Sequence, residues 1–307
     1  MSMTLVFTQI LIILLYVAVG YAAGKLRLID PEQRRYLTHL CSDLILPFTI
    51  LSASSQEVGG EGFAAIGIAT VLMFLIMGGT LALMLGFHRL RRSPDALRAA
   101  TTSLISFPNL TFLGLPLCKA LFGDIAVLYN ASCMMSFNVL FFTVQSSLFT
   151  GKRAKLSSLL TVPLVSTVIM IVMLALKLHF PDPVQTAVSS IGSMITPLSL
   201  MIIGVMMSEN HLIELLKEKR AYIVVLLRNL VIPLIAMLVL LVLPLQPRDK
   251  LCVLVYMACP CATLTTIYSI QTDKEPELCA RSVLLSTVAF AATLPVIIAI
   301  GQRCLGV

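Results

Sequence analysis

Long apolar segments recur along the whole chain, and they constrain its fold more than any other feature. About 20 mostly apolar residues form a helix that crosses the hydrocarbon layer of a membrane. Charged residues make up only 12% of the chain, about half of the share found in soluble domains. The sequence therefore predicts an all-α membrane protein. We expect ten spans, at residues 5–23, 36–55, 62–87, 97–121, 125–149, 158–178, 184–207, 221–243, 250–272 and 278–300.

Lys and Arg residues are distributed unevenly between the two sides of these spans. Of the 22, sixteen lie in or beside the loops that follow odd-numbered spans, five lie on the other side, and Arg228 lies within a span. Because Lys and Arg concentrate in cytoplasmic loops, we expect both termini on the non-cytoplasmic side of a plasma membrane. The same distribution accounts for the net charge of +7, so we expect membrane lipid and no nucleic acid as a partner.

Two pairs of Pro-containing segments indicate an internal repeat. Pro47 and Pro197 lie in spans two and seven, and Pro108 and Pro260 lie in spans four and nine, each pair about half the chain apart. Five helices is an odd number, so a second copy must enter the membrane from the opposite side. The sequence therefore predicts two inverted five-helix repeats. Their expected bounds are residues 1–150 and 158–307, with a short cytoplasmic linker at 151–157.

Pro108 and Pro260 are expected to interrupt spans four and nine near the middle of the membrane. A proline removes a backbone donor and clashes with the preceding turn, and unpaired backbone groups are tolerated only where they are buried in protein or line a cavity. If the two broken helices cross, their half-helix N-termini favour an anion and their C-terminal ends favour a cation. The alternative is two ordinary proline kinks that neighbouring helices stabilise.

Polar residues around these breaks are candidates for substrate binding. An Asn amide can donate to a carboxylate without burying a cation, although Asn and Thr also satisfy opened backbone groups. Asn138 shares one face of span five with Asn130 and Gln145, where substrate binding and interhelical hydrogen bonds are both open. The candidate substrate-binding residues are Pro108, Asn109, Thr111, Asn138, Pro260, Cys261 and Thr263.

Two charged residues within the spans are candidates for coupling. Asp43 is either a proton or cation site or the partner of a neighbouring group, since intramembrane carboxylates are costly. Arg228 either attracts a substrate carboxylate or extends to the cytoplasmic headgroups. The Cys259-Pro260-Cys261 sequence resembles soft-metal sites only over three residues, so no metal site is expected. The spans also lack hydrolase and protease motifs, and we expect neither an enzyme nor a cofactor.

Three collinear motifs carry a family resemblance. The segment from Phe107 to Gly123 contains an Asn, a Gly-x-Pro and a Gly, and it resembles the fourth-helix signature of the auxin efflux carrier family. Pro197 to Gly204 is similar to the seventh-helix signature, and Asp273 to Pro295 to the last helix. The short 151–157 linker resembles the bacterial malonate and malate carriers of the family more than the plant carriers, and implies a bacterial inner membrane.

The resemblance implies a fold similar to bile-acid symporters and Na⁺/H⁺ antiporters, with broken, crossing helices four and nine. Spans one, two, six and seven would form a scaffold, and spans three to five and eight to ten a moving transport domain. It also implies a secondary transporter of a small organic anion, with Asn109 contacting substrate, a possible H⁺ or Na⁺ coupling ion and a possible homodimer. A non-transporting receptor or scaffold on the same fold, and a cation/proton antiporter, remain alternatives.

Overall fold

The computed structural model describes residues 3–56, 58–152, 160–209 and 218–306, and the elements within them are helical. The first half contains α1 (Met3–Lys25), α2 (Pro31–Leu40), α3 (Leu46–Ser52), α4 (Gly60–Arg91), α5 (Asp95–Ser106), α6 (Leu115–Phe122), α7 (Ile125–Leu140) and α8 (Ser146–Thr150). The second half contains α9 (Val162–Ala175), α10 (Asp182–Ser193), α11 (Ile195–Ser208), α13 (Lys219–Leu226), α14 (Ile232–Val242), α15 (Pro247–Ala258), α16 (Thr263–Thr272) and α17 (Pro276–Leu305).

Among the described residues, seven helical segments are long and apolar enough to cross a membrane, so the chain is an all-α membrane protein. They are Thr4–Lys25, Pro31–Ser55, Gly62–Arg91, Ile125–Thr150, Asp182–Ser208, Lys219–Val242 and Pro276–Leu305. The other three expected spans are shorter pieces. Span four is divided into α5 and Leu110–Phe122, span nine into α15 and α16, and span six is the 14-residue α9. Most of the expected 151–157 linker lies outside the described residues.

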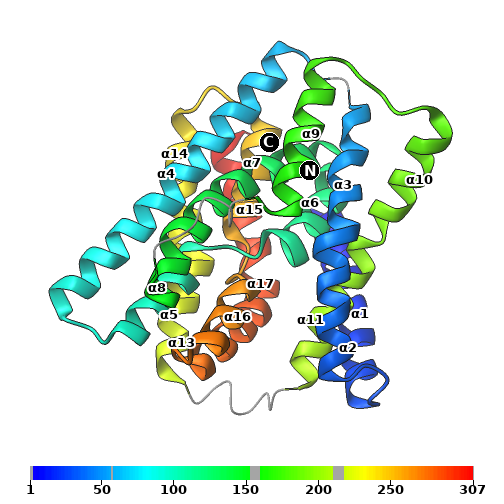
Figure 1. Ribbon diagram of the computed structural model, residues 1–307. Coiled ribbons are helices and arrows are strands. Elements are labelled where there is room, and N and C mark those ends of the chain that lie inside the picture. The colour runs from blue at the N-terminus through cyan, green and yellow to red at the C-terminus, as the bar shows by residue number, and fades with distance from the viewer. Residues whose placement is uncertain (1–2, 57, 153–159, 210–217, 307) are drawn as a thin grey trace.

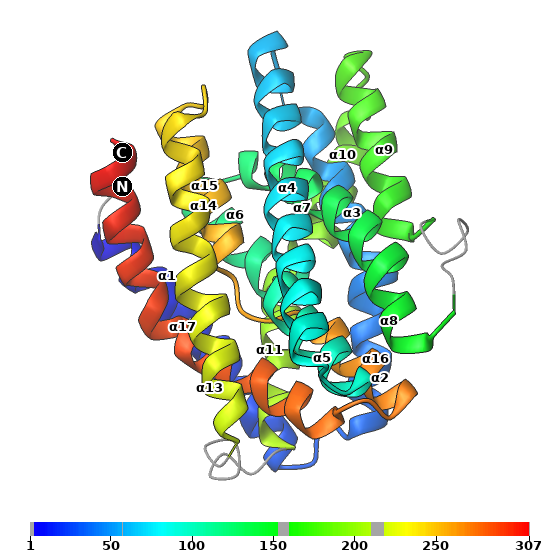
Figure 2. The ribbon, with the colours of Figure 1, turned by 90° about the vertical axis from the view of Figure 1, so that its left-hand side faces the viewer.

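Two groups of helices lie on different sides of the interrupted segments between α5 and α6 and between α15 and α16 (Figure 1). On one side, α1 packs along α11, and α3 packs against α9 and α10. The backbones approach closely there: a Cβ on Gly20 would lie 2.0 Å from the carbonyl oxygen of Met201, and the Thr49 hydroxyl donates to the Gly192 carbonyl over 2.8 Å. On the other side, α4 packs against α5 and α7, and α13 and α14 lie alongside α17 (Figure 2).

Single π turns interrupt several of these helices. Because proline has no N–H, the regular hydrogen-bond pattern cannot close across it, and a π turn ends just before a helix that carries proline at its second position in three places. These are Cys41–Ile45 before Pro47, Leu110–Gly114 before Pro116, and Leu227–Val231 before Pro233. Helix distortions were expected at Pro108 and Pro260, but not at Pro116 or Pro233.

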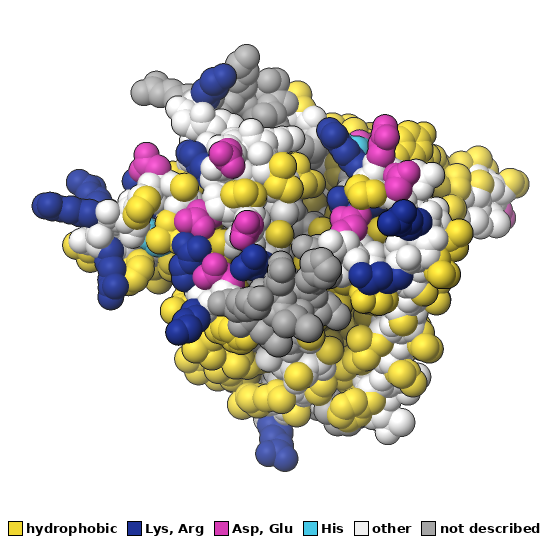
Figure 3. All heavy atoms as spheres, turned by 90° about the horizontal axis from the view of Figure 1, so that it is seen from below, with side chains coloured by type: hydrophobic (Ala, Val, Ile, Leu, Met, Phe, Trp, Pro, Cys, Tyr) yellow, Lys and Arg dark blue, Asp and Glu magenta, His cyan; other side chains and the backbone are white. Residues whose placement is uncertain are grey.

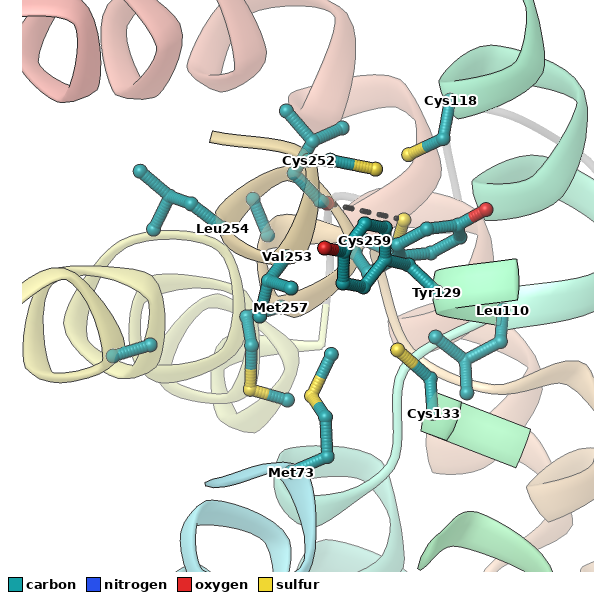
Figure 4. Packing of buried hydrophobic residues seen from close by; sticks show 14 of the residues in the cluster. Met73, Leu110, Cys118, Tyr129, Cys133, Cys252, Val253, Leu254, Met257 and Cys259 are labelled. Atoms are coloured by element: carbon teal, nitrogen blue, oxygen red, sulfur yellow. Dashed lines mark hydrogen bonds between the residues drawn. The ribbon is translucent and has the colours of Figure 1, made fainter. Parts of the chain in front are cut away.

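A sulfur-rich core is formed by side chains of α6, α7 and α15. Figure 4 shows the thiols of Cys118, Cys133, Cys252 and Cys259 around Tyr129. All eight cysteines are free, and seven are buried. The thiol of Cys259 donates to the carbonyl of Val255 over 3.4 Å. These side chains fill space as small apolar groups.

Charged side chains gather on the end of the molecule where α2 and α13 begin and α16 ends (Figures 1 and 3). Arg34 pairs with Glu209 there, and Arg220 pairs with both Glu218 and Glu275. Hydrogen bonding to Arg220 holds the pKa of the Glu218 carboxyl below its usual range.

Candidate functional site

The two interrupted segments lie side by side and are joined through their backbones. Pro108 and Cys261 form an isolated antiparallel bridge. The N–H of Asn109 donates to the carbonyl of Pro260 over 2.8 Å, and the N–H of Ala262 donates to the carbonyl of Phe107 over 3.0 Å. The prolines open both helices, and each opened segment supplies partners that the other needs.

Two half-helix N-termini begin directly after this bridge. The Asn109 side-chain oxygen accepts from the N–H of Phe112 over 3.2 Å and caps the turn that leads into α6. The N-cap of α16 is Ala262, whose side chain cannot accept a hydrogen bond. The first N–H groups of a helix have no partners within it, and they carry partial positive charge. The N–H of Thr265 donates to the carbonyl of Ala262 over 3.2 Å, but no side chain caps the start of α16.

Two half-helix C-termini end on the other side of the bridge, at a buried arginine. The Arg228 guanidinium donates to the carbonyls of Ile105 in α5 (3.2 Å), Met257 in α15 (2.5 Å) and Cys259 (3.0 Å). The Arg228 side chain is completely buried. It lies in the π turn Leu227–Val231, a local distortion that is frequent at functional sites.

A cavity of about 530 Å³ lies against the half-helix N-termini. Five of the seven predicted substrate-binding residues line it: Pro108, Asn109, Thr111, Asn138 and Thr263. Helix α2 and the following π turn line the facing wall, with Thr38, Ser42 and Asp43 among their residues. Apolar side chains such as Phe137 and Phe142 complete the lining. The volume suits a small organic molecule.

Two amide donors at this cavity have no hydrogen-bond partner in the described structure. They are the side-chain nitrogens of Asn109 and Asn138, both on side chains that are nearly completely buried. The Asn109 side-chain oxygen already accepts from Phe112, which fixes the direction of its amide. A buried unpaired donor costs about 1–3 kcal/mol. This cost is recovered when a ligand supplies an acceptor.

Helix α2 brings two arginines and a histidine to the same cavity. The cavity wall includes Arg34, Arg35 and His39. None of them was among the predicted site residues. The carboxylate of Asp43 lies 3.6 Å from the His39 ring nitrogen, and its side chain is 60% exposed. Asp43 is therefore a wall residue of an open cavity beside a histidine. Arg34 and Arg35 were not expected at the site because Lys and Arg near a span also indicate its cytoplasmic end.

The comparison with known families agrees with this architecture. The model of the family described as membrane transport protein matches residues 5–159 and 142–298. The chain belongs to the auxin efflux carrier family. It is therefore a multi-pass membrane transporter. No curated protein matches the chain.

Two predicted substrate-binding residues of this transporter, Pro260 and Cys261, do not line the cavity. Pro260 contributes its carbonyl to the backbone bridge. The Cys261 side chain packs in an apolar cluster with Leu104 and Cys279, and its N–H donates to the Ser286 hydroxyl over 3.2 Å. In the expected repeat, Pro260 and Cys261 are the counterparts of Pro108 and Asn109. In the second segment, however, Ala262 and Thr263 border the cavity.

Arg228 matches neither of the two roles considered for it. It does not reach the headgroups, because its side chain is completely buried, and it does not line the cavity. Its three backbone acceptors lie in α5 and at the end of α15. A guanidinium can bond carbonyls of two helices at once because its five donors form a rigid planar fork.

Asn130 and Gln145, the other polar candidates of the carrier, and two threonines of α16 have other partners or other locations. Gln145 donates to the carbonyl of Ala99 over 2.7 Å, an interhelical hydrogen bond between the π turn after α7 and helix α5. Asn130 is buried away from the cavity. Thr265 bonds the Ser103 hydroxyl over 2.7 Å, while Thr266 lines a neighbouring cavity of about 330 Å³ that also borders Thr263.

Cys259 and Cys261 do not converge on one site. Cys259 packs with Tyr256 and Met257, whereas Cys261 packs with Leu104 in a different apolar cluster. Within the described part of the chain, no group of three or more His, Cys, Asp or Glu side chains is placed to hold a metal ion.

Proposed function

We propose that this carrier moves a small organic anion, a mono- or dicarboxylate, by alternating access through the cavity at the crossing of helices four and nine. The observation that carries the proposal is the pair of unpartnered amide donors of Asn109 and Asn138 beside the uncapped N-terminus of α16. Donors and helix N-termini favour negative charge.

The charges around the cavity support an anion rather than a cation as substrate. Arg34 and Arg35 line it, and Asp43 is its one acidic lining residue among the described residues. Arg34 pairs with Glu209 and Asp43 lies beside His39, so the Arg35 guanidinium is the main positive charge that the cavity offers to a substrate. Cation and proton pathways are commonly marked by ionisable side chains within the membrane. The crossing presents amides, hydroxyls and backbone N–H groups instead, with Asp43 on the opposite wall.

Alternating access also requires two bodies that can move relative to each other. We propose ten spans in two inverted repeats, with α1 to α3 and α9 to α11 as the scaffold and the remaining helices as the transport domain. The close contacts between α1 and α11, and between α3 and α10, support the scaffold. With both termini outside the cytoplasm, the cavity lies between the crossing and the cytoplasmic face.

Counterflow in proteoliposomes tests the proposal. Liposomes that contain the purified chain and are preloaded with unlabelled malonate or malate should accumulate the labelled compound transiently. A receptor on this fold would bind these compounds without accumulation. Absence of counterflow across a panel of small mono- and dicarboxylates would contradict the proposal.

Asn109→Ser locates the site within that assay. Serine keeps an oxygen that can cap the turn at Phe112, but it lacks the amide donors. Because a hydrogen bond to a charged group contributes about 1.5–3 kcal/mol, we expect kcat/KM to fall roughly tenfold to hundredfold while the melting temperature changes little. Asn130→Ser is the matched control in a buried position away from the cavity, and it should transport normally.

A further inference from the structure

The guanidinium of Arg228 occupies a position of unusual electrostatic character. The half-helices α5 and α15 both end there, and helix C-termini carry partial negative charge. Three backbone carbonyls, those of Ile105, Met257 and Cys259, are directed at the guanidinium within 3.2 Å. No described carboxylate forms an ion pair with Arg228. The positive charge is therefore balanced by helix ends and carbonyl dipoles alone.

A convergent group of carbonyl oxygens is also the ligand set that a hard cation uses. In transporters with broken helices, unwound carbonyls and half-helix C-termini coordinate the coupling Na⁺. In this chain the same kinds of group, contributed by both broken helices, are already occupied by a covalently attached cation. The Arg228 side chain is completely buried, so no water-sized space adjoins its guanidinium.

We propose that Arg228 is the resident counter-cation of the helix crossing, and that it replaces a coupling Na⁺ at the C-terminal ends of α5 and α15. Arg228 is thus a positioning residue. It fixes the two helix ends against each other without touching the substrate, and the crossing needs no alkali cation to assemble. One consequence rests on the proposed carrier function: transport through this site is independent of Na⁺.

The surroundings of Arg228 fit a structural cation that stays in place. The neighbouring Asn229 donates to the carbonyl of Ser286 over 2.8 Å, and the Ser286 hydroxyl accepts from the N–H of Cys261. These contacts connect the π turn that carries Arg228 to α17 and to the second extended segment. The three carbonyl acceptors hold the guanidinium of Arg228. The contacts of Asn229 and Ser286 hold the turn that carries it.

Thermal unfolding of the purified full chain, in NaCl or in choline chloride at equal ionic strength, tests the proposal without a substrate. We expect the wild-type melting temperature to be the same in both salts. Arg228→Ser should lower it by several degrees, because three carbonyls and two helix ends lose their cation. Na⁺ should restore part of this loss, increasingly with concentration, by entering the vacated carbonyl group.

Two further variants keep the test decisive. Arg228→Lys retains a cation with fewer donors, so it should melt between the wild type and Arg228→Ser and remain insensitive to Na⁺. Arg303→Ser removes an exposed arginine of α17 and should change neither property. A wild type that Na⁺ stabilises relative to choline would overturn the proposal, and so would an Arg228→Ser chain that Na⁺ does not stabilise. Neither result depends on counterflow, so the anion-carrier proposal is tested separately.

Discussion

The N–H of Asn109 donates to the carbonyl of Pro260 over 2.8 Å, although the two residues lie in different halves of the chain. This bond and its counterpart between Ala262 and Phe107 form a backbone bridge, with the half-helix N-termini on one side of it and the C-termini on the other. The same geometry therefore produces a donor-rich cavity and a carbonyl-rich pocket, which holds Arg228. The two ends of the broken helices have opposite electrostatic roles within a few residues of each other.

Asn138 should contribute to substrate affinity, as is proposed for Asn109. Its amide nitrogen is buried without a partner, and the residue lines the cavity. We expect Asn138→Ala to raise KM about tenfold, the equivalent of one hydrogen bond to a charged group. Asn130→Ala removes the same side chain from the same helix away from the cavity and should change KM less than twofold. Equal effects of the two substitutions on counterflow kinetics would contradict the assignment.

Arg35 should attract the anion electrostatically without holding it tightly. Its side chain is exposed and lines the cavity, and exposed charges act over about 10 Å at moderate salt. Arg35→Gln should raise KM severalfold at low ionic strength, with little effect on the maximal rate, and the difference should shrink as salt is added. Arg89→Gln, an exposed arginine outside the cavity lining, is the control. A salt-independent effect would indicate direct binding.

The contact between α1 and α11 should depend on glycine. A Cβ on Gly204 would lie 2.0 Å from the carbonyl of Val17, which is backbone and cannot move aside easily. We expect Gly204→Ala to destabilise the chain by at least about 2 kcal/mol, measured as a lower melting temperature. Gly86→Ala in α4 is the matched control, because a Cβ there meets open space and alanine favours helix. It should melt at or slightly above the wild type.

Thiol labelling should separate the cysteines sharply. Cys304 is exposed and the other seven are buried, so a maleimide should modify one thiol per folded chain and eight after denaturation. Cys304→Ser should abolish labelling of the folded protein. Rapid labelling of that variant in the native state would show that the sulfur-rich core is more accessible than the packing around Tyr129 indicates.

The sequence predicts the membrane class and the positions of the helix interruptions because these depend on local signals. Apolar length identifies the spans, and Pro108 and Pro260 identify the interruptions. The paired backbone segments, and the presence of Asn109, Thr111 and Thr263 at the cavity, follow from those signals. The helix number is less certain from sequence, because span six is a short helix and spans four and nine are divided.

Other features could not be predicted because they depend on partners that the sequence does not show. Arg228 bonds backbone carbonyls, and a carbonyl is present at every residue. Arg228 lies in a π turn that ends just before Pro233, and no distortion was expected at this proline. Arg35 and His39 become cavity residues only because α2 packs opposite the crossing. Cys261 was expected at the cavity by symmetry, but its side chain is directed into an apolar cluster.

Substrate protection of a cavity cysteine tests the central proposal most directly. Thr263→Cys in a Cys304→Ser background places a thiol at the start of α16, on the cavity wall. Its reaction with a small maleimide should be slowed by malonate or malate over the concentration range that saturates counterflow. An unchanged labelling rate at saturating concentrations, in a variant that still catalyses counterflow, would show that the anion binds elsewhere.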